Sequence, residues 1–200
     1  MEITIERIKE LRELTGAGVL DAKKALEAAG GDFDQATEAL RAKGLARAEK
    51  RSDRDAGEGV IEVYSHPGGR VGVMLELNCE TDFVAMNDAF QELAHDLALH
   101  VAAMAPLYLS REEVPAQDLD SQAEQMRSEA RAEGKPDSIV DKIVEGRLNK
   151  FYAETVILEQ PFVKDDSITV DELIKNAIAK LGENIILRRF VRYELGGTLA

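Results

Sequence analysis

The sequence predicts an α+β protein: a three-helix module at the N-terminus, a flexible linker, and a larger core with a three-stranded antiparallel sheet. Three observations carry this prediction. Apolar residues recur at helical spacing through the first forty residues. Apolar and polar residues then alternate at 61–64 and 71–77, and residues 184–195 are rich in β-branched and aromatic side chains. The net charge of −13 lies wholly after residue 54, because residues 1–54 carry 11 basic and 11 acidic side chains.

The N-terminal module, residues 1–45, is predicted to be a bundle of three short helices. Thr4 is placed to cap the first helix, which ends at the sequence TGAG, residues 15–18. The second helix covers residues 19–28 and stops at a glycine pair, and Asp32 caps the third. Apolar side chains expected to face the core of this bundle are Ile5, Ile8, Leu11 and Leu14 in the first helix, and Phe33, Ala36 and Leu40 in the third.

A charged linker, residues 46–59, is expected to follow. Residues 41–54 hold six basic and two acidic side chains, and residues 55–59 read DAGEG. A charged stretch that ends in glycines is typical of a flexible tether. The N-terminal module and the core, residues 60–200, are therefore expected to fold as separate units.

The core is predicted to begin with a β-hairpin that has one buried face. Ile61 and Val63 alternate with polar neighbours, and the sequence HPGG, residues 66–69, forms the turn. The final strand, residues 184–195, can complete a three-stranded antiparallel sheet. The sheet needs helices to cover its apolar face.

Four helices are predicted in the core. A helix over residues 87–104 carries one apolar stripe, and helices over 118–133 and 138–156 form an antiparallel hairpin around the turn GKP. The last helix ends at residue 181, where Gly182 follows. Its start is marked by Thr169 and Glu172 at capping-box spacing.

Composition excludes several classes of protein. A strongly acidic surface repels phosphate backbones, so nucleic acid is not expected as a direct partner. The single cysteine allows no intrachain disulfide. The first ten residues are too charged for a signal peptide or an anchor, and no stretch approaches the ~18 apolar residues of a membrane helix. A cytoplasmic protein without membrane contact is expected.

The sequence offers little material for covalent chemistry. The three histidines, His66, His95 and His100, have no cysteine at ligand spacing, so no metal site is expected. No glycine-rich loop with Lys and Ser or Thr is present, so no nucleotide cofactor is expected either. A small hydrolase that uses Cys79 as its nucleophile is one alternative, although a lone cysteine at a strand end is more often a small core residue. His100 is either a part-buried, hydrogen-bonded residue or a contact at the rim of a partner surface.

Two short stretches have both a local and a functional explanation. The sequence TGAG is followed by Val19 and Leu20, which places two aliphatic side chains at the exposed start of a helix. Asp82 and Phe83 stand in a polar, acidic loop between a strand and a helix. The local explanations are packing within the bundle in the first case, and a core phenylalanine beside a helix-capping aspartate in the second. A partner surface would explain both stretches equally well.

Together these stretches resemble the bacterial elongation factor Ts family, the guanine-nucleotide exchange factors of elongation factor Tu. The pairing of TGAG with a distant TDFVA is highly specific. The similarity covers nearly the whole chain, through the segments at residues 8–32, 75–90, 98–106, 145–154, 160–170 and 182–196.

The resemblance implies a role for each candidate residue. It implies an N-terminal module similar to a ubiquitin-associated domain, in which Arg12, Val19 and Leu20 dock on the GTP-binding domain of the partner. It implies that His100 approaches another domain of the partner. It also implies that four residues form the loop that dislodges magnesium from the GTPase, with the phenylalanine wedged between two of its helices: Thr81, Asp82, Phe83 and Val84.

The role of Asp82 stays open between partner contact and helix cap. The alternative function is a ubiquitin-associated-like adaptor that tethers a partner without exchange activity. A homodimer is expected, because a lone three-stranded sheet has exposed edges and residues 185–187 are apolar on both faces. Longer family members carry a duplicated core subdomain, and this chain is too short for both that duplication and a projecting coiled coil. A second copy could supply the missing subdomain through a twofold interface.

Overall fold

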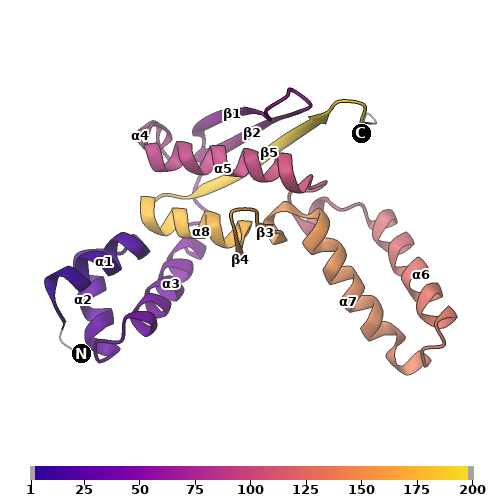
Figure 1. The fold of residues 1–200 in the computed structure, drawn as a ribbon, viewed down its shortest axis with the longest axis horizontal. Coiled ribbons are helices and arrows are strands. Elements are labelled where there is room, and N and C mark those ends of the chain that lie inside the picture. Colours follow the sequence, from indigo (N-terminus) through magenta and orange to yellow (C-terminus); the bar gives the residue numbers. More distant parts are fainter. Residues whose placement is uncertain (1–2, 198–200) are drawn as a thin grey trace.

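A computed structural model describes residues 3–197, so the outer ends of the predicted 1–45 and 60–200 ranges lie outside it. Its elements form an N-terminal helical bundle, a central sheet with helices on one face, and a projecting helical hairpin (Figure 1). In chain order they are α1 (Ile5–Thr15), α2 (Val19–Ala28), α3 (Phe33–Glu49), β1 (Glu58–Ser65), β2 (Val71–Cys79), α4 (Asp82–Ala85), α5 (Asp88–Met104), η1 (Arg111–Glu113), α6 (Ala116–Ala132), α7 (Asp137–Thr155), η2 (Ile157–Glu159), β3 (Pro161–Phe162), β4 (Asp165–Thr169), α8 (Val170–Leu181) and β5 (Ile185–Glu194).

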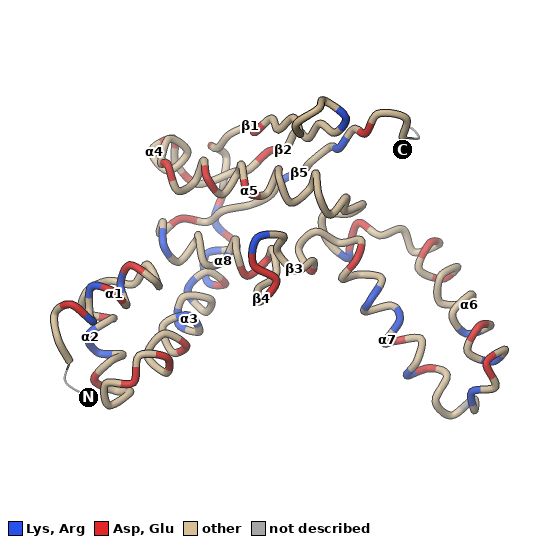
Figure 2. Tube along the Cα trace, viewed as in Figure 1, with Lys and Arg blue, Asp and Glu red and all other residues tan. Residues whose placement is uncertain are grey.

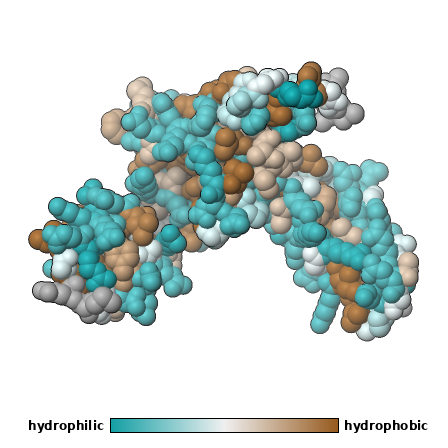
Figure 3. All heavy atoms as spheres, viewed as in Figure 1, coloured by the Kyte–Doolittle hydropathy of each residue, from teal (hydrophilic) through white to brown (hydrophobic). Residues whose placement is uncertain are grey.

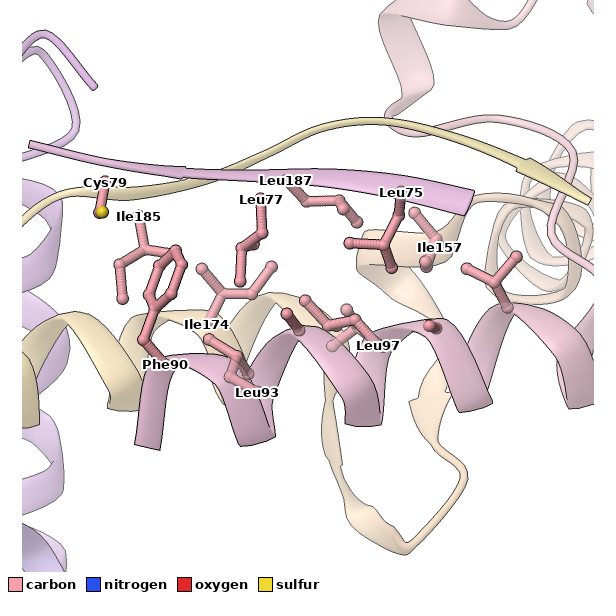
Figure 4. Close-up of a cluster of buried hydrophobic side chains, with 14 of the residues drawn as sticks. Leu75, Leu77, Cys79, Phe90, Leu93, Leu97, Ile157, Ile174, Ile185 and Leu187 are labelled. Atoms are coloured by element: carbon pink, nitrogen blue, oxygen red, sulfur yellow. The ribbon is translucent and has the colours of Figure 1, made fainter. Parts of the chain in front are cut away.

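The predicted three-stranded antiparallel sheet is confirmed, with β2 between β1 and β5. Helices α5 and α8 cover one face of it, and Figure 4 shows the side chains that meet there. The largest of them are buried, among them Leu75, Leu77, Phe90, Leu97 and Leu187. Burying one such side chain contributes about 1.5–3 kcal/mol, so this layer supplies most of the stability of the core.

The buried face of the hairpin includes Glu62 and Tyr64 of β1 as well as Val60. Glu62 pairs with Leu75 and Tyr64 pairs with Val73, and directly paired residues point to the same side of a sheet. Because Leu75 and Val73 point into the core, Glu62 and Tyr64 must do so as well. Ile61 and Val63 therefore face solvent, and the alternation in the sequence did not reveal this. The register with β2, rather than hydrophobicity alone, assigns the faces.

The final strand is positioned as predicted, but its apolar start serves a different purpose. The side chains of Ile185 and Leu187 are buried on the inner face of the sheet. The expectation that residues 185–187 form part of an exposed dimer surface is therefore corrected. A β-bulge at the pairing of Glu76 and Leu77 with β5 shifts the register there, so side-chain direction does not simply alternate through this region.

The N-terminal bundle has the three predicted helices. Thr4 caps α1 by accepting from the Arg7 amide, and Asp32 caps α3 by accepting from the Gln35 amide. Its small core comprises Leu11, Ala22, Leu26, Ala36 and Leu40.

Two apolar residues of α1 do not join that core. Ile5 and Leu14 were expected to face inward, and both are exposed. Three short helices bury only a narrow stripe of each other. Leu14 instead lines a groove between the bundle and α8.

The expected flexible tether is corrected for residues 46–54. Helix α3 continues to Glu49, and Ala48 is buried in the main core cluster. Arg51 Nη1 donates to the Ile178 carbonyl at 3.3 Å. Asn184 Nδ2 donates to the carbonyls of Ser52 at 3.2 Å and Arg54 at 2.7 Å. Charge made this segment resemble a linker, but these backbone carbonyls and the small Ala48 fasten it to the core.

The predicted helical hairpin projects from the core as α6 and α7 (Figure 1). A separate small cluster holds its helices together, and Arg147 bridges them by donating to Glu129 and Glu133. Basic and acidic residues are interspersed along these helices and along the N-terminal bundle (Figure 2). The two-stranded sheet of β3 and β4, which lies before α8, was not predicted because its strands are so short.

Candidate functional site

The candidate site is the turn that joins β2 to α5. Strand β2 ends at the buried Cys79, and the single-turn helix α4 follows. Thr81 caps α4 by accepting from the Val84 amide at 3.4 Å. Asp82 therefore does not cap the helix: it stands exposed in the first turn, where a negative charge complements the helix dipole.

The side chains of α4 divide between core and solvent. Val84 and Ala85 are buried and anchor the turn to the sheet and α5. Phe83 is 79% exposed. The local explanation of Phe83 as a core residue is thus wrong. The phenylalanine of this segment that packs in the core is Phe90.

Met86 extends the exposed apolar surface of this turn. It follows Phe83 by three residues and is 71% exposed. Sequence reasoning missed it, although its helical spacing from Phe83 was a usable signal. Phe83 and Met86, together called the apolar tip, are two large apolar side chains that this fold leaves uncovered.

Two carboxylates fasten the start of this turn. Glu183 accepts from the Thr81 amide at 3.0 Å and from the Thr81 hydroxyl at 2.7 Å. Glu80 accepts from the Asn184 amide at 2.7 Å and from Arg54 at 3.4 Å. Sequence reasoning did not find these partners, because Glu80 and Asn184 are far apart in the chain and the motif around Glu183 carried no chemical signature.

Cys79 lacks the environment of a nucleophile. Burial raises the pKa of its thiol, and the negative charge of Glu183 raises that pKa further. The thiol donates to the Thr81 carbonyl at 3.1 Å. A buried thiol with a raised pKa is a poor nucleophile, so the geometry disfavours the hydrolase alternative. Within residues 3–197 there is also no group of three His, Cys, Asp or Glu side chains that could hold a metal ion.

The second predicted stretch lies at the start of α2. Gly16 adopts a left-handed conformation at φ 66° and ends α1, and Thr15 bonds back to the Leu11 carbonyl. This turn leaves Val19 and Leu20 on the surface, with Leu20 73% exposed. Arg12 is exposed one turn before the end of α1. The bundle and α4 lie at the same end of the long axis of the molecule (Figure 1).

His100 is not part of any surface. It is fully buried, and burial lowers its pKa. The Val163 amide donates to its Nδ1 at 3.2 Å, so its Nε2 carries the proton and donates to Gln160 Oε1 at 2.9 Å. The expectation that His100 lies at the rim of a partner surface is therefore wrong, because its side chain is inaccessible. His100 instead fastens α5 to the β3–β4 hairpin.

The comparisons with known proteins identify the family of the chain. The family model described as "Elongation factor TS" matches residues 5–197. The chain belongs to the elongation factor Ts family. It is 58% identical to elongation factor Ts of Herpetosiphon aurantiacus, over 98% of this chain and 99% of that one.

Two further relatives show the same similarity. Elongation factor Ts of Desulfitobacterium hafniense is 54% identical over 98% of this chain and 90% of its own. That of Carboxydothermus hydrogenoformans is 54% identical over 99% and 91%. Membership of the elongation factor Ts family makes the chain a translation elongation factor that acts in protein biosynthesis. In the described part of the chain, no helix is both long and apolar enough to cross a membrane.

Proposed function

We propose that this chain binds elongation factor Tu in its GDP-bound form and promotes the release of GDP, which allows GTP to rebind. The observation that carries the proposal is Phe83, a large apolar side chain that is 79% exposed on a turn held by hydrogen bonds at its start and by the buried Val84 and Ala85. An exposed aromatic residue on a fixed turn has the form of a wedge for a pocket on another protein. Burying such a ring contributes about 2 kcal/mol, enough for a binding hot spot.

The proposed mechanism needs no covalent chemistry. Magnesium bridges a GTPase to the phosphates of its nucleotide and neutralises their charge. The turn formed by Thr81, Asp82, Phe83 and Val84 displaces the elements of the GTPase that hold this ion, and the nucleotide then dissociates faster. Linkage makes the effect reciprocal: nucleotide weakens binding of the exchange factor by the same factor. The chain itself uses no cofactor.

The N-terminal bundle supplies a second contact in this proposal. We infer that the bundle is similar to a ubiquitin-associated domain and docks on the GTP-binding domain through Arg12, Val19 and Leu20. Exposed aliphatic side chains at the start of α2 suit such docking. Two contacts on one partner raise the affinity beyond that of either contact alone.

A second copy of the chain is the proposed partner of the open sheet face. Val63, Met74 and Val191 form a directly paired row across β1, β2 and β5, and they are 64%, 49% and 41% exposed. Ile61 and Tyr193 lie on the same face of the sheet, in the paired rows on either side of this one, and the five residues together are called here the outer row. Hydrophobic side chains gather along the side of the molecule where the sheet lies (Figure 3). Apolar rows of this kind are covered in assembled proteins, and a twofold axis would cover both copies at once.

The proposed setting is the cytoplasm, with no direct contact to nucleic acid or membrane. The net charge of −13 supports the first exclusion, because phosphate backbones carry the same sign.

The experiment that tests the function is release of fluorescent GDP from preloaded elongation factor Tu. Catalytic amounts of this chain should accelerate release many-fold, and Phe83→Ala should abolish most of the acceleration while binding through the bundle persists. An adaptor without exchange activity would bind elongation factor Tu but leave the release rate unchanged. That result would overturn the proposed function.

A further inference from the structure

The apolar tip lies on a helix that is too short to be stable without contacts to the rest of the protein. Helix α4 has four residues. Helices this short are unstable alone, because nucleation costs more than one turn of hydrogen bonds returns. The direction of Phe83 is therefore set by the contacts of α4 with its surroundings: the buried Val84 and Ala85, and the hydrogen bonds at its N-terminal end.

The N-terminal end of α4 is held by one carboxylate. Both oxygens of Glu183 are used: Oε2 accepts from the Thr81 amide at 3.0 Å, and Oε1 accepts from the Thr81 hydroxyl at 2.7 Å. The same hydroxyl oxygen accepts from the Val84 amide and caps α4. Glu183 thus orients the atom that starts the helix on which Phe83 stands. Hydrogen bonds to an ionised carboxylate are about twice as strong as neutral ones.

The contact is reciprocal, which makes it a two-sided clamp. Thr81 donates two hydrogen bonds to Glu183, and in the opposite direction the Asn184 amide donates one to Glu80 Oε1 at 2.7 Å. Asn184 is buried, and its side chain also holds the carbonyls of Ser52 and Arg54. Glu183 follows Gly182, whose left-handed φ of 84° ends α8 and turns the chain toward α4. The clamp therefore joins residues 81–84, called here the exchange turn, to the end of α8 and to the segment that leads from the bundle.

We propose that Glu183 is the positioning residue of the exchange turn: it acts through Thr81 to hold the apolar tip in the orientation that a partner GTPase receives. The functional part of this proposal rests on the exchange activity proposed above. Its structural part does not, and the two can be measured separately.

The structural part is tested by fluorescence in the absence of any partner. The chain contains no tryptophan, so Phe83→Trp introduces a single probe at the tip. In that background, Glu183→Ala should lower the time-resolved anisotropy of the probe, and Glu183→Gln, which keeps one acceptor, should give an intermediate value. Glu62→Ala is the matched control, because Glu62 also accepts from one side chain, on His95, but lies on β1 away from the turn. Unchanged anisotropy in Glu183→Ala with a native circular dichroism spectrum would overturn the proposal.

The functional part is tested by GDP release at saturating and at limiting concentrations of the chain. Glu183→Ala should lower the maximal rate by up to about 100-fold, the loss that a misplacement of about 1 Å can cause, with a smaller change in the concentration for half-maximal effect. In a Phe83→Ala background the same change should have almost no further effect, because Glu183 acts through the tip. Independent, multiplying effects of the two variants would overturn the proposal.

Failure of the proposed function gives a different pattern. If the wild-type chain does not accelerate GDP release, the exchange assignment fails, whereas the anisotropy result still decides whether Glu183 orders the turn. If Phe83→Ala slows release and Glu183→Ala does not, exchange stands and the positioning role is overturned.

Discussion

Phe83 and Phe90 lie seven residues apart in one segment and have opposite environments. Phe90 projects from α5 toward the sheet and is fully buried (Figure 4), whereas Phe83 is 79% exposed on α4. The contrast separates a residue that packs in the core from one whose side chain is exposed to a partner. It also gives a matched pair of variants.

We expect Phe83→Ala to leave stability nearly unchanged and to reduce stimulated GDP release sharply. Phe90→Ala should lower the free energy of unfolding by about 3–5 kcal/mol, because it opens a cavity in the core. Chemical denaturation and fluorescent-GDP release, measured on both variants, check the pair. A large loss of stability in Phe83→Ala with exchange intact would contradict the assignment.

The sequence predicted most elements because their signals are local. The capping box of Thr169 and Glu172 is present on α8, and the Asp32 cap starts α3 where the sequence placed it. Those signals lie within a few residues of each other, so no tertiary information was needed. The TGAG turn and the TDFV turn were found for the same reason.

Features set by tertiary contacts could not be predicted in this way. The inward side of β1 depends on pairing with β2, and the burial of His100 depends on Gln160 and Val163. The fixed position of residues 46–54 depends on Asn184, which is 130 residues beyond Arg54. In each case the deciding partner lies on another element, so the local sequence pattern alone did not give the surroundings of the residue.

The buried His100 should make stability depend on pH. Its pKa is lowered from an ordinary value of 6.5, so the folded state binds its proton less readily than the unfolded state does. The stability contributed by neutral His100 is present above pH 6.5 and is lost as the pH falls below it, by up to ~1.4 kcal/mol per pH unit. Denaturation between pH 7.5 and 5 should show this slope, and His100→Gln should flatten it. His95→Gln, an exposed histidine on the same helix, is the control and should keep the slope.

Gly44 should control how the N-terminal bundle sits on the core. A Cβ added at Gly44 would lie 3.1 Å from the Cβ of Ala179, so α3 and α8 pack at close range there. Gly44→Leu should force the helices apart and expose the segment after α3, and protease should then cut faster between residues 41 and 59. Lys24→Leu, on the exposed side of α2, is the control. Equal cleavage rates in the wild type and in Gly44→Leu would mean that this packing does not restrain the bundle, and that residues 1–45 behave as the separate unit predicted from the sequence.

Val191→Lys should convert the proposed homodimer into monomers. Val191 lies at the end of the paired row Val63–Met74–Val191, so a charge placed there would be buried without a partner in a face-to-face dimer. Because the outer row faces away from the core, each monomer should stay folded, with an unchanged melting temperature at low concentration. Sedimentation equilibrium should report about twice 22.0 kDa for the wild type and 22.0 kDa for the variant. Ser128→Lys adds the same charge at an exposed position of α6 in the projecting hairpin, outside the sheet, and is the control that should stay dimeric. A wild-type chain that sediments as a monomer at micromolar concentration would exclude the dimer and leave the exchange proposal untouched, because the apolar tip lies on α4 and not on the outer row.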